Sequence, residues 1–93
     1  MFGAIRTKKI VHDGVGYDYL FPNGYGASVV SHSYSYGGER GLWELMITYG
    51  EDSVYDTEIT PDVIGFLTWD GVNKYLKQVS DLDLRNTNEK VKL

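Results

Sequence analysis

The fold is decided by the stretch Phe21–Tyr49, FPNGYGASVVSHSYSYGGERGLWELMITY. Its outer parts, Tyr25–His32 and Leu42–Tyr49, each predict a β-strand because aromatic and β-branched residues are concentrated in them. Alternate side chains of a strand point to opposite faces of a sheet, so the second segment predicts one apolar face directed at the core. The side chains of that face are Trp43, Leu45, Ile47 and Tyr49.

Two further strands are predicted before this stretch. Ala4–His12 is expected to form an edge strand or an ordered arm, in which the Lys8-Lys9 pair discourages edge-to-edge aggregation. Val15–Phe21 alternates with period two and ends at a Pro22-Asn23-Gly24 turn, because Asn and Gly tolerate positive φ. Ala4–Phe21 therefore predicts two strands that precede the central pair.

The pattern after Tyr49 predicts a short strand at Ser53–Glu58 and then helices. Thr60-Pro61-Asp62 has the residues of a helix N-terminus and predicts a short helix over Pro61–Phe66. Thr68 is a second candidate N-cap, and an apolar stripe of Val72, Leu76 and Val79 follows it. We therefore predict one α+β domain over residues 1–93: a four- to five-stranded antiparallel β-meander covered by a C-terminal helical segment. Residues 1–12 are the arm or edge strand, and 83–93 are a possible flexible tail.

Composition excludes several classes of protein. The chain has 93 residues, of which 42% are hydrophobic, and this is typical of a globular domain. It has no Cys, so disulfides, thiolate catalysis and Cys-ligated zinc are excluded. There is neither an apolar run of about 20 residues nor a signal-peptide pattern, so we expect no membrane association and a cytoplasmic location in a host cell.

The net charge of −4 is unevenly distributed. Seven acidic residues and no Lys or Arg lie between Gly41 and Asn73. Phosphate would be repelled by such a segment, so we expect no direct nucleic-acid binding and favour a protein partner with a basic surface. An ordinary solvated acidic surface is the other interpretation of the same pattern.

Catalytic and metal-binding patterns are weak. His12 and His32 are the two histidines, and no Gly-x-Ser-x-Gly motif accompanies them. The acidic residues do not follow the spacing of a calcium loop. Gly14-x-Gly16 and Gly24-x-Gly26 precede strands, whereas a dinucleotide loop follows a strand and opens a helix. We therefore predict a non-enzymatic protein with no catalytic residues, no metal and no cofactor.

The loop Ser31–Gly41 is rich in Ser, Tyr and Gly, a composition typical of recognition loops. Three interpretations are open: a partner contact, a structural excursion that packs its own tyrosines, or a mobile segment without a role. Trp43 and Trp69 are expected to anchor the core, although Trp69 could instead lie exposed at an interface.

Several segments resemble a group of small uncharacterised proteins encoded by tailed bacteriophages. The matching segments are Phe21–Val30, Tyr34–Gly38, Gly41-Leu42, Glu44-Leu45, Thr57, Ile59-Thr60, Asp62-Val63, Gly65 and Leu67. They cover about half of the chain and carry no established activity. The resemblance implies a small phage accessory protein that binds and inhibits a host protein, as anti-CRISPR and other anti-defence proteins do.

Charge and loop composition together yield a functional hypothesis. We expect an inhibitor of a host nuclease or defence complex, with an acidic surface and a contact loop. The predicted partner-binding residues are Tyr34, Tyr36, Glu39, Arg40, Glu51, Asp52, Asp56, Glu58 and Asp62. The alternative is a structural or assembly subunit that forms a homo-oligomer, with a homodimer as one form. A small hydrolase would require His32 and an acidic residue to converge in a pocket.

Overall fold

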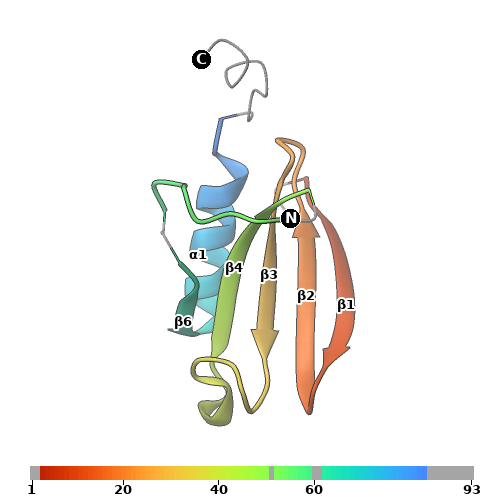
Figure 1. Cartoon of the computed structure of the whole chain (residues 1–93), viewed down its shortest axis with the longest axis vertical. Helices are drawn as coiled ribbons and strands as arrows, with labels where there is room; N and C mark the ends of the chain where they lie inside the picture. Colours follow the sequence, from red (N-terminus) through yellow and green to blue (C-terminus); the bar gives the residue numbers. More distant parts are fainter. Residues whose placement is uncertain (1–2, 51, 60–61, 84–93) are drawn as a thin grey trace.

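The computed structural model of this chain describes residues 3–50, 52–59 and 62–83. Its elements in chain order are β1 (Ile5–Val11), β2 (Gly14–Leu20), β3 (Tyr25–Ser31), the 3₁₀-helix η1 (Gly38–Arg40), β4 (Trp43–Tyr49), β5 (Asp52–Ser53), β6 (Ile64–Leu67) and α1 (Trp69–Ser80). Figure 1 shows the sheet with α1 beside it. The predicted α+β architecture is therefore confirmed.

All pairs of neighbouring strands are antiparallel, and the strand order β1-β2-β3-β4-β5 is that of a meander. β6 adds a sixth strand, because it pairs with β4 beside β5. The register places Val29 opposite Leu45 and Ala27 opposite Ile47, so these four side chains share one face of the sheet. β1 lies at the edge, as the prediction of an edge strand requires.

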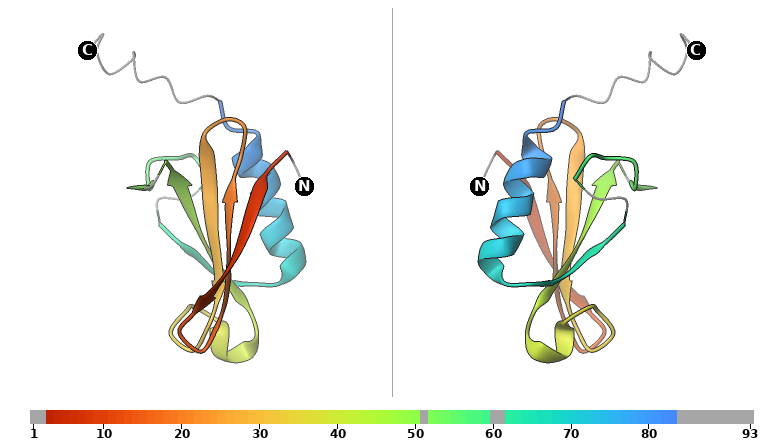
Figure 2. Two further views of the ribbon diagram at one scale, coloured as in Figure 1. Left: turned by 90° about the vertical axis from the view of Figure 1, so that its right-hand side faces the viewer. Right: turned by 90° about the vertical axis from the view of Figure 1, so that its left-hand side faces the viewer.

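The core lies between that face and α1, and Figure 2 shows the helix on one side of the sheet. From the sheet, Val29, Leu45 and Ile47 are almost completely buried. The helix contributes its predicted apolar stripe of Val72, Leu76 and Val79, all buried. Thr68 is confirmed as the N-cap, because its side chain accepts a hydrogen bond from the Gly71 N–H.

The C-terminal end of α1 is held by the turn between β2 and β3. The Asn23 side-chain amide donates to the carbonyl oxygens of Val79, Ser80 and Leu82 at 2.9, 3.3 and 3.0 Å. Its own carbonyl oxygen accepts the Tyr25 N–H at 3.0 Å. A helix leaves its last carbonyls without intrahelical partners, so a side chain from a distant turn supplies the missing donors here.

The two tryptophans pack against the core, as expected. Their rings meet edge-on with 4.9 Å between centroids, and Tyr17 lies 5.9 Å from Trp43 and 5.8 Å from Trp69. This aromatic group closes the end of the core at which α1 begins.

Two predictions about the segment after β4 were wrong. The helix predicted over Pro61–Phe66 is replaced by β6, because Ile64 and Leu67 pair with Leu45 and Trp43 of β4. Local helix signals gave way to sheet pairing, which leaves Ile64 and Leu67 partly buried. The strand predicted at Ser53–Glu58 shrinks to β5, the two residues Asp52–Ser53.

Some of the predicted features fall on residues that the structure does not describe. The predicted N-cap and first helical residue, Thr60 and Pro61, lie outside the described residues, as does the tail from residue 84 onward. No helix in the described ranges combines the length and the apolar character that a membrane span requires.

Candidate functional site

One end of the sheet gathers three segments that are far apart in the sequence. The loop 32–42 joins β3 to β4 there, the β1–β2 turn reaches the same end, and β6 runs back to it from the opposite end of β4 (Figure 1, lower end). This end carries the loop in which the sequence predicted a contact surface.

The loop 32–42 is held by its own hydrogen bonds. Backbone N–H groups of Ser35, Gly38 and Gly41 donate to the carbonyls of His32, Ser35 and Gly38 at 3.0–3.1 Å, so the chain turns three times in succession. The buried Ser35 hydroxyl donates to the His32 carbonyl at 2.9 Å and accepts the His32 N–H at 3.0 Å. The loop is therefore built on a side chain that the sequence analysis did not single out.

Tyr36 connects the loop to the sheet. Its N–H donates to Glu44 Oε1 of β4 at 3.0 Å, and its carbonyl accepts the Phe66 N–H of β6 at 3.1 Å. The two backbones come so close that a Cβ at Gly65 would overlap the Cβ of Tyr36. Glu44 thus serves to hold the loop in place, although in the sequence it counts as part of the acidic segment.

Phe66 has a φ of 56°, a left-handed conformation that is a genuine outlier for a bulky residue. Its Cα would lie 2.9 Å from a Cβ on Gly37, whose own φ is 91°, so the strained residue is packed against a backbone that only glycine permits. Strained residues of this kind concentrate at functional sites, where the surrounding structure holds them.

Three aromatic side chains at this end point into solvent. The exposed fractions are 80% for Tyr34, 60% for Tyr36 and 58% for Phe66. Beside them is a hollow of about 230 Å³ whose lining includes Tyr36, Phe66, Glu39 and Arg40. We call Tyr34, Tyr36, Phe66, Glu39 and Arg40 the aromatic end. Sequence analysis missed Phe66, because it placed this residue in a helix.

The two histidines meet beside the aromatic end. His12 occupies the turn between β1 and β2 with a φ of 52°, and its ring centroid lies 4.8 Å from that of His32 and 5.2 Å from that of Tyr34. The Nδ1 atom of His32 accepts the Tyr34 N–H at 3.1 Å. This proximity could not be predicted from the sequence, because it depends on the strand register that brings the β1–β2 turn beside the end of β3.

The same cluster contains a carboxylate. Asp13 Oδ1 accepts the Ser33 N–H at 2.9 Å, and this hydrogen bond is the main reason that the pKa of Asp13 lies below its ordinary value. The Ser33 hydroxyl and the nearby His32 lower the pKa of Asp13 further.

This grouping has the residue types of a hydrolase but not the required geometry. The Asp13 carboxylate accepts the Ser33 N–H, and Nδ1 of His32 accepts the Tyr34 N–H. The carboxylate therefore does not orient the imidazole as it would in a catalytic triad. The Ser35 hydroxyl is engaged by the backbone of His32. These bonds fix the loop, and they leave the imidazole pair as a partly exposed polar surface beside Tyr34.

The predicted acidic residues lie elsewhere. Asp52, Asp56 and Glu58 are exposed on segment 52–59, which follows β4, whereas the loop 32–42 precedes it. The two segments therefore occupy opposite ends of β4 (Figure 1). Asp62 is exposed just before β6, where its Oδ1 accepts the Val63 N–H at 2.8 Å, and Glu51 lies outside the described residues. The predicted site residues thus form two separate regions rather than one site.

In the ranges that the structure describes, no three His, Asp or Glu side chains gather in a way that could hold a metal ion. No protein-family model, no curated protein and no solved structure matches this chain. The function proposed below is therefore inferred from the geometry of the aromatic end.

Proposed function

We propose that this chain is a non-enzymatic binding protein that contacts a partner protein through its aromatic end. The observation that carries the proposal is the exposure of Tyr34, Tyr36 and Phe66 on backbones held by hydrogen bonds. Tyr, Phe and Arg are enriched in the centres of protein interfaces, because they bury large areas in contact with a partner.

Preorganisation supports this proposal. The backbones of Tyr34 and Tyr36 are each fixed by a bond to a side chain, His32 and Glu44 respectively, so binding would freeze few additional degrees of freedom. The strained backbone of Phe66 supports the same proposal, because it holds the aromatic ring in solvent instead of burying it. A loop without a binding role would gain stability by folding these rings inward.

The class of partner follows from the bacteriophage resemblance and from charge. A host defence protein, such as a CRISPR effector, is the proposed target, and inhibition is the proposed outcome. Segment 52–59 would add a second contact with a basic surface of that target, since its Asp52 and Glu58 are exposed. The two contacts would lie at opposite ends of β4, so a target must span the molecule to use both.

The experiment is affinity capture from lysate of the bacterial host, followed by measurement of affinity for the captured protein. We expect the double variant Tyr34→Ala/Tyr36→Ala to weaken binding by about 100-fold, because hot-spot aromatics contribute about 2 kcal/mol or more. Lys74→Ala is the control, since Lys74 is exposed on α1 and lies outside both proposed contacts. Equal binding by wild type and double variant would overturn the proposal.

The acidic contact has a separate test. Asp52→Lys/Glu58→Lys should weaken binding to the same captured protein, and the effect should shrink as salt is added. Unchanged affinity would remove the acidic segment from the proposal and leave the aromatic end in place.

The assembly-subunit hypothesis makes an opposite prediction. A structural subunit would form a defined oligomer whose size does not change on dilution, whereas an inhibitor of this type would be monomeric until it meets its target. Light scattering across a concentration series distinguishes the two.

A further inference from the structure

The two edges of the sheet differ. On one side, β4 is covered by the two short strands β5 and β6, and the pairing with β6 is irregular between Trp43 and Leu45. On the other side, β1 is seven residues long and, among the described residues, pairs only with β2. Its register with β2 is unbroken from Ile5 to Val11. The edge formed by β1 is therefore long and regular, and such an edge can accept another strand.

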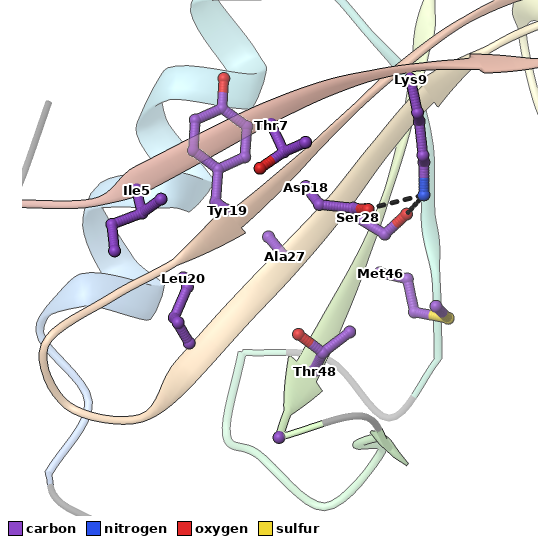
Figure 3. Close-up of a pocket in the computed structure, with 11 residues that line it drawn as sticks. Ile5, Thr7, Lys9, Asp18, Tyr19, Leu20, Ala27, Ser28, Met46 and Thr48 are labelled. Atoms are coloured by element: carbon purple, nitrogen blue, oxygen red, sulfur yellow. Dashed lines mark hydrogen bonds and ion pairs between the residues drawn. The ribbon is translucent and has the colours of Figure 1, made fainter.

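Lysine and arginine normally protect an edge strand by extending past it into solvent. Here two of the three cations of β1 fold back over the sheet. Lys9 Nζ lies 2.7 Å from Asp18 Oδ1 and 3.3 Å from Ser28 Oγ, and Figure 3 shows it reaching across the neighbouring strands. Arg6 lies over the ring of Tyr17, with Cζ 4.9 Å from the centroid. Lys8 is the remaining cation of β1, and its exposed side chain can extend past the edge.

The two faces beside this edge differ in character. On the face that α1 covers, β1 presents Arg6 and Lys8. On the opposite face, Ile5, Thr7 and Leu20 border an open groove of about 420 Å³ (Figure 3). Ile5 borders the groove and is 67% exposed, whereas Ile10 is 86% exposed and lies on the same face as Arg6 and Lys8. A strand added beside β1 would therefore meet Arg6, Lys8 and Ile10 on one face, and on the other Ile5 and Thr7 beside the Lys9–Asp18 ion pair.

We propose that β1 binds an extended segment of a partner protein by adding it as an edge strand. The segment would alternate acidic side chains, directed at Arg6 and Lys8, with β-branched apolar side chains that extend the border of the groove. Main-chain hydrogen bonds supply the affinity, and charge selects the partner.

Charge also disfavours a second copy of this chain as the occupant. β1 contains Arg6, Lys8 and Lys9 and no acidic residue, so pairing two copies of β1 brings three cations against three. Like charges opposite one another on adjacent strands are destabilising. This surface is separate from the aromatic end, and the inference does not depend on the function proposed for that end.

The test uses the full chain and a capped nine-residue peptide of alternating Glu and Val. We expect a dissociation constant of about 1 mM or tighter, with amide shifts centred on β1 and new hydrogen-exchange protection at every second β1 amide. A Lys-Val peptide of equal length should bind at least about tenfold more weakly. The proposal is overturned if β1 amides do not respond, or if the two peptides bind equally.

A second experiment uses charge variants of the chain. Lys8→Glu should weaken binding of the Glu-Val peptide by about fivefold, because attraction becomes repulsion across the pair. Lys74→Glu makes the same charge change on α1, at an exposed position, and should leave binding unchanged. If both variants weakened peptide binding equally, the binding would be due to long-range charge attraction and not to strand addition, and the proposal would be overturned. If two copies of the chain associate and protect the β1 amides in the absence of peptide, the occupant of the edge is a second copy, and the proposal of an acidic partner is overturned.

Discussion

The face of the sheet beneath α1 and the aromatic end use the same residue types in opposite ways. Under the helix, Tyr19, Phe21 and Tyr25 are almost fully buried, whereas Tyr34, Tyr36 and Phe66 are mostly exposed. The first group has regular strand or turn backbone, and the second includes a strained residue and a loop stabilised by side chains. Burial therefore accounts for the position of the first group of side chains, whereas it does not account for the second.

The largest expected effect tests that difference directly. Phe21→Ala should lower the free energy of unfolding by about 3–5 kcal/mol, because it leaves a cavity in the core. Tyr34→Ala should change it by less than about 0.5 kcal/mol, because the side chain is mostly solvated. Urea unfolding followed by fluorescence of Trp43 and Trp69 measures both. A large loss in Tyr34→Ala would mean that the aromatic end is part of the fold after all.

The next effect concerns how the helix is kept over its face. Asn23→Ala should lower the free energy of unfolding by about 1–2 kcal/mol, because three carbonyls near the end of α1 lose a donor. Asn23→Asp keeps the acceptor for the Tyr25 N–H but loses the donors, so it should be at least as destabilising. If Asn23→Asp were as stable as the wild type, the contact with α1 would not matter to stability.

A smaller effect of opposite sign is expected at Phe66. Phe66→Gly should raise the free energy of unfolding by about 1 kcal/mol, because glycine adopts a φ of 56° without strain. Phe66→Ala removes the same ring and keeps the strain, so it should not be stabilised. Thermal unfolding of the two variants compares them, and equal stability would show that the backbone is not strained.

The smallest effect is the pH dependence contributed by Asp13. Its pKa is lower in the folded chain than in the unfolded chain, so the stabilisation is present above about pH 4 and is lost as the pH falls below it. Asp13→Asn should therefore unfold with a shallower dependence on pH in that acid range. Acid titrations of the two proteins, followed by circular dichroism, measure this, and parallel curves would exclude Asp13 as a contributor.

The strands and the main helix were predictable because their signals are local. Leu45 and Ile47 lie at alternate positions in a segment flanked by Glu44 and Thr48, and Thr68 precedes a stripe at helical spacing, so nearby residues alone identify each element. Ile64–Leu67 was mispredicted because Thr60-Pro61-Asp62 resembles a helix start and the four residues carry little pattern of their own. Their conformation is set by pairing with β4, which is far away in sequence.

The candidate site was predictable in part for the same reason. The composition of Ser31–Gly41 marked Tyr34 and Tyr36, whereas Phe66 and the His12–His32 pair depend on register and topology. The acidic residues after Tyr49 and the loop were both predicted as partner contacts, and because the acidic window begins only where the second strand begins, the sequence already allowed two separate faces. The fold places the two regions at opposite ends of β4 (Figure 1).

The contact between Asn23 and the end of α1 also bears on the order in which the chain folds. Each hairpin of the meander joins neighbouring segments, whereas Asn23 reaches residues 56 to 59 positions later. Closing such a long loop costs entropy before any contact forms, so we expect docking of α1 to be slower than formation of the hairpins. On a ribosome, the hairpins can form first, and one apolar face of the sheet stays uncovered until α1 has been made.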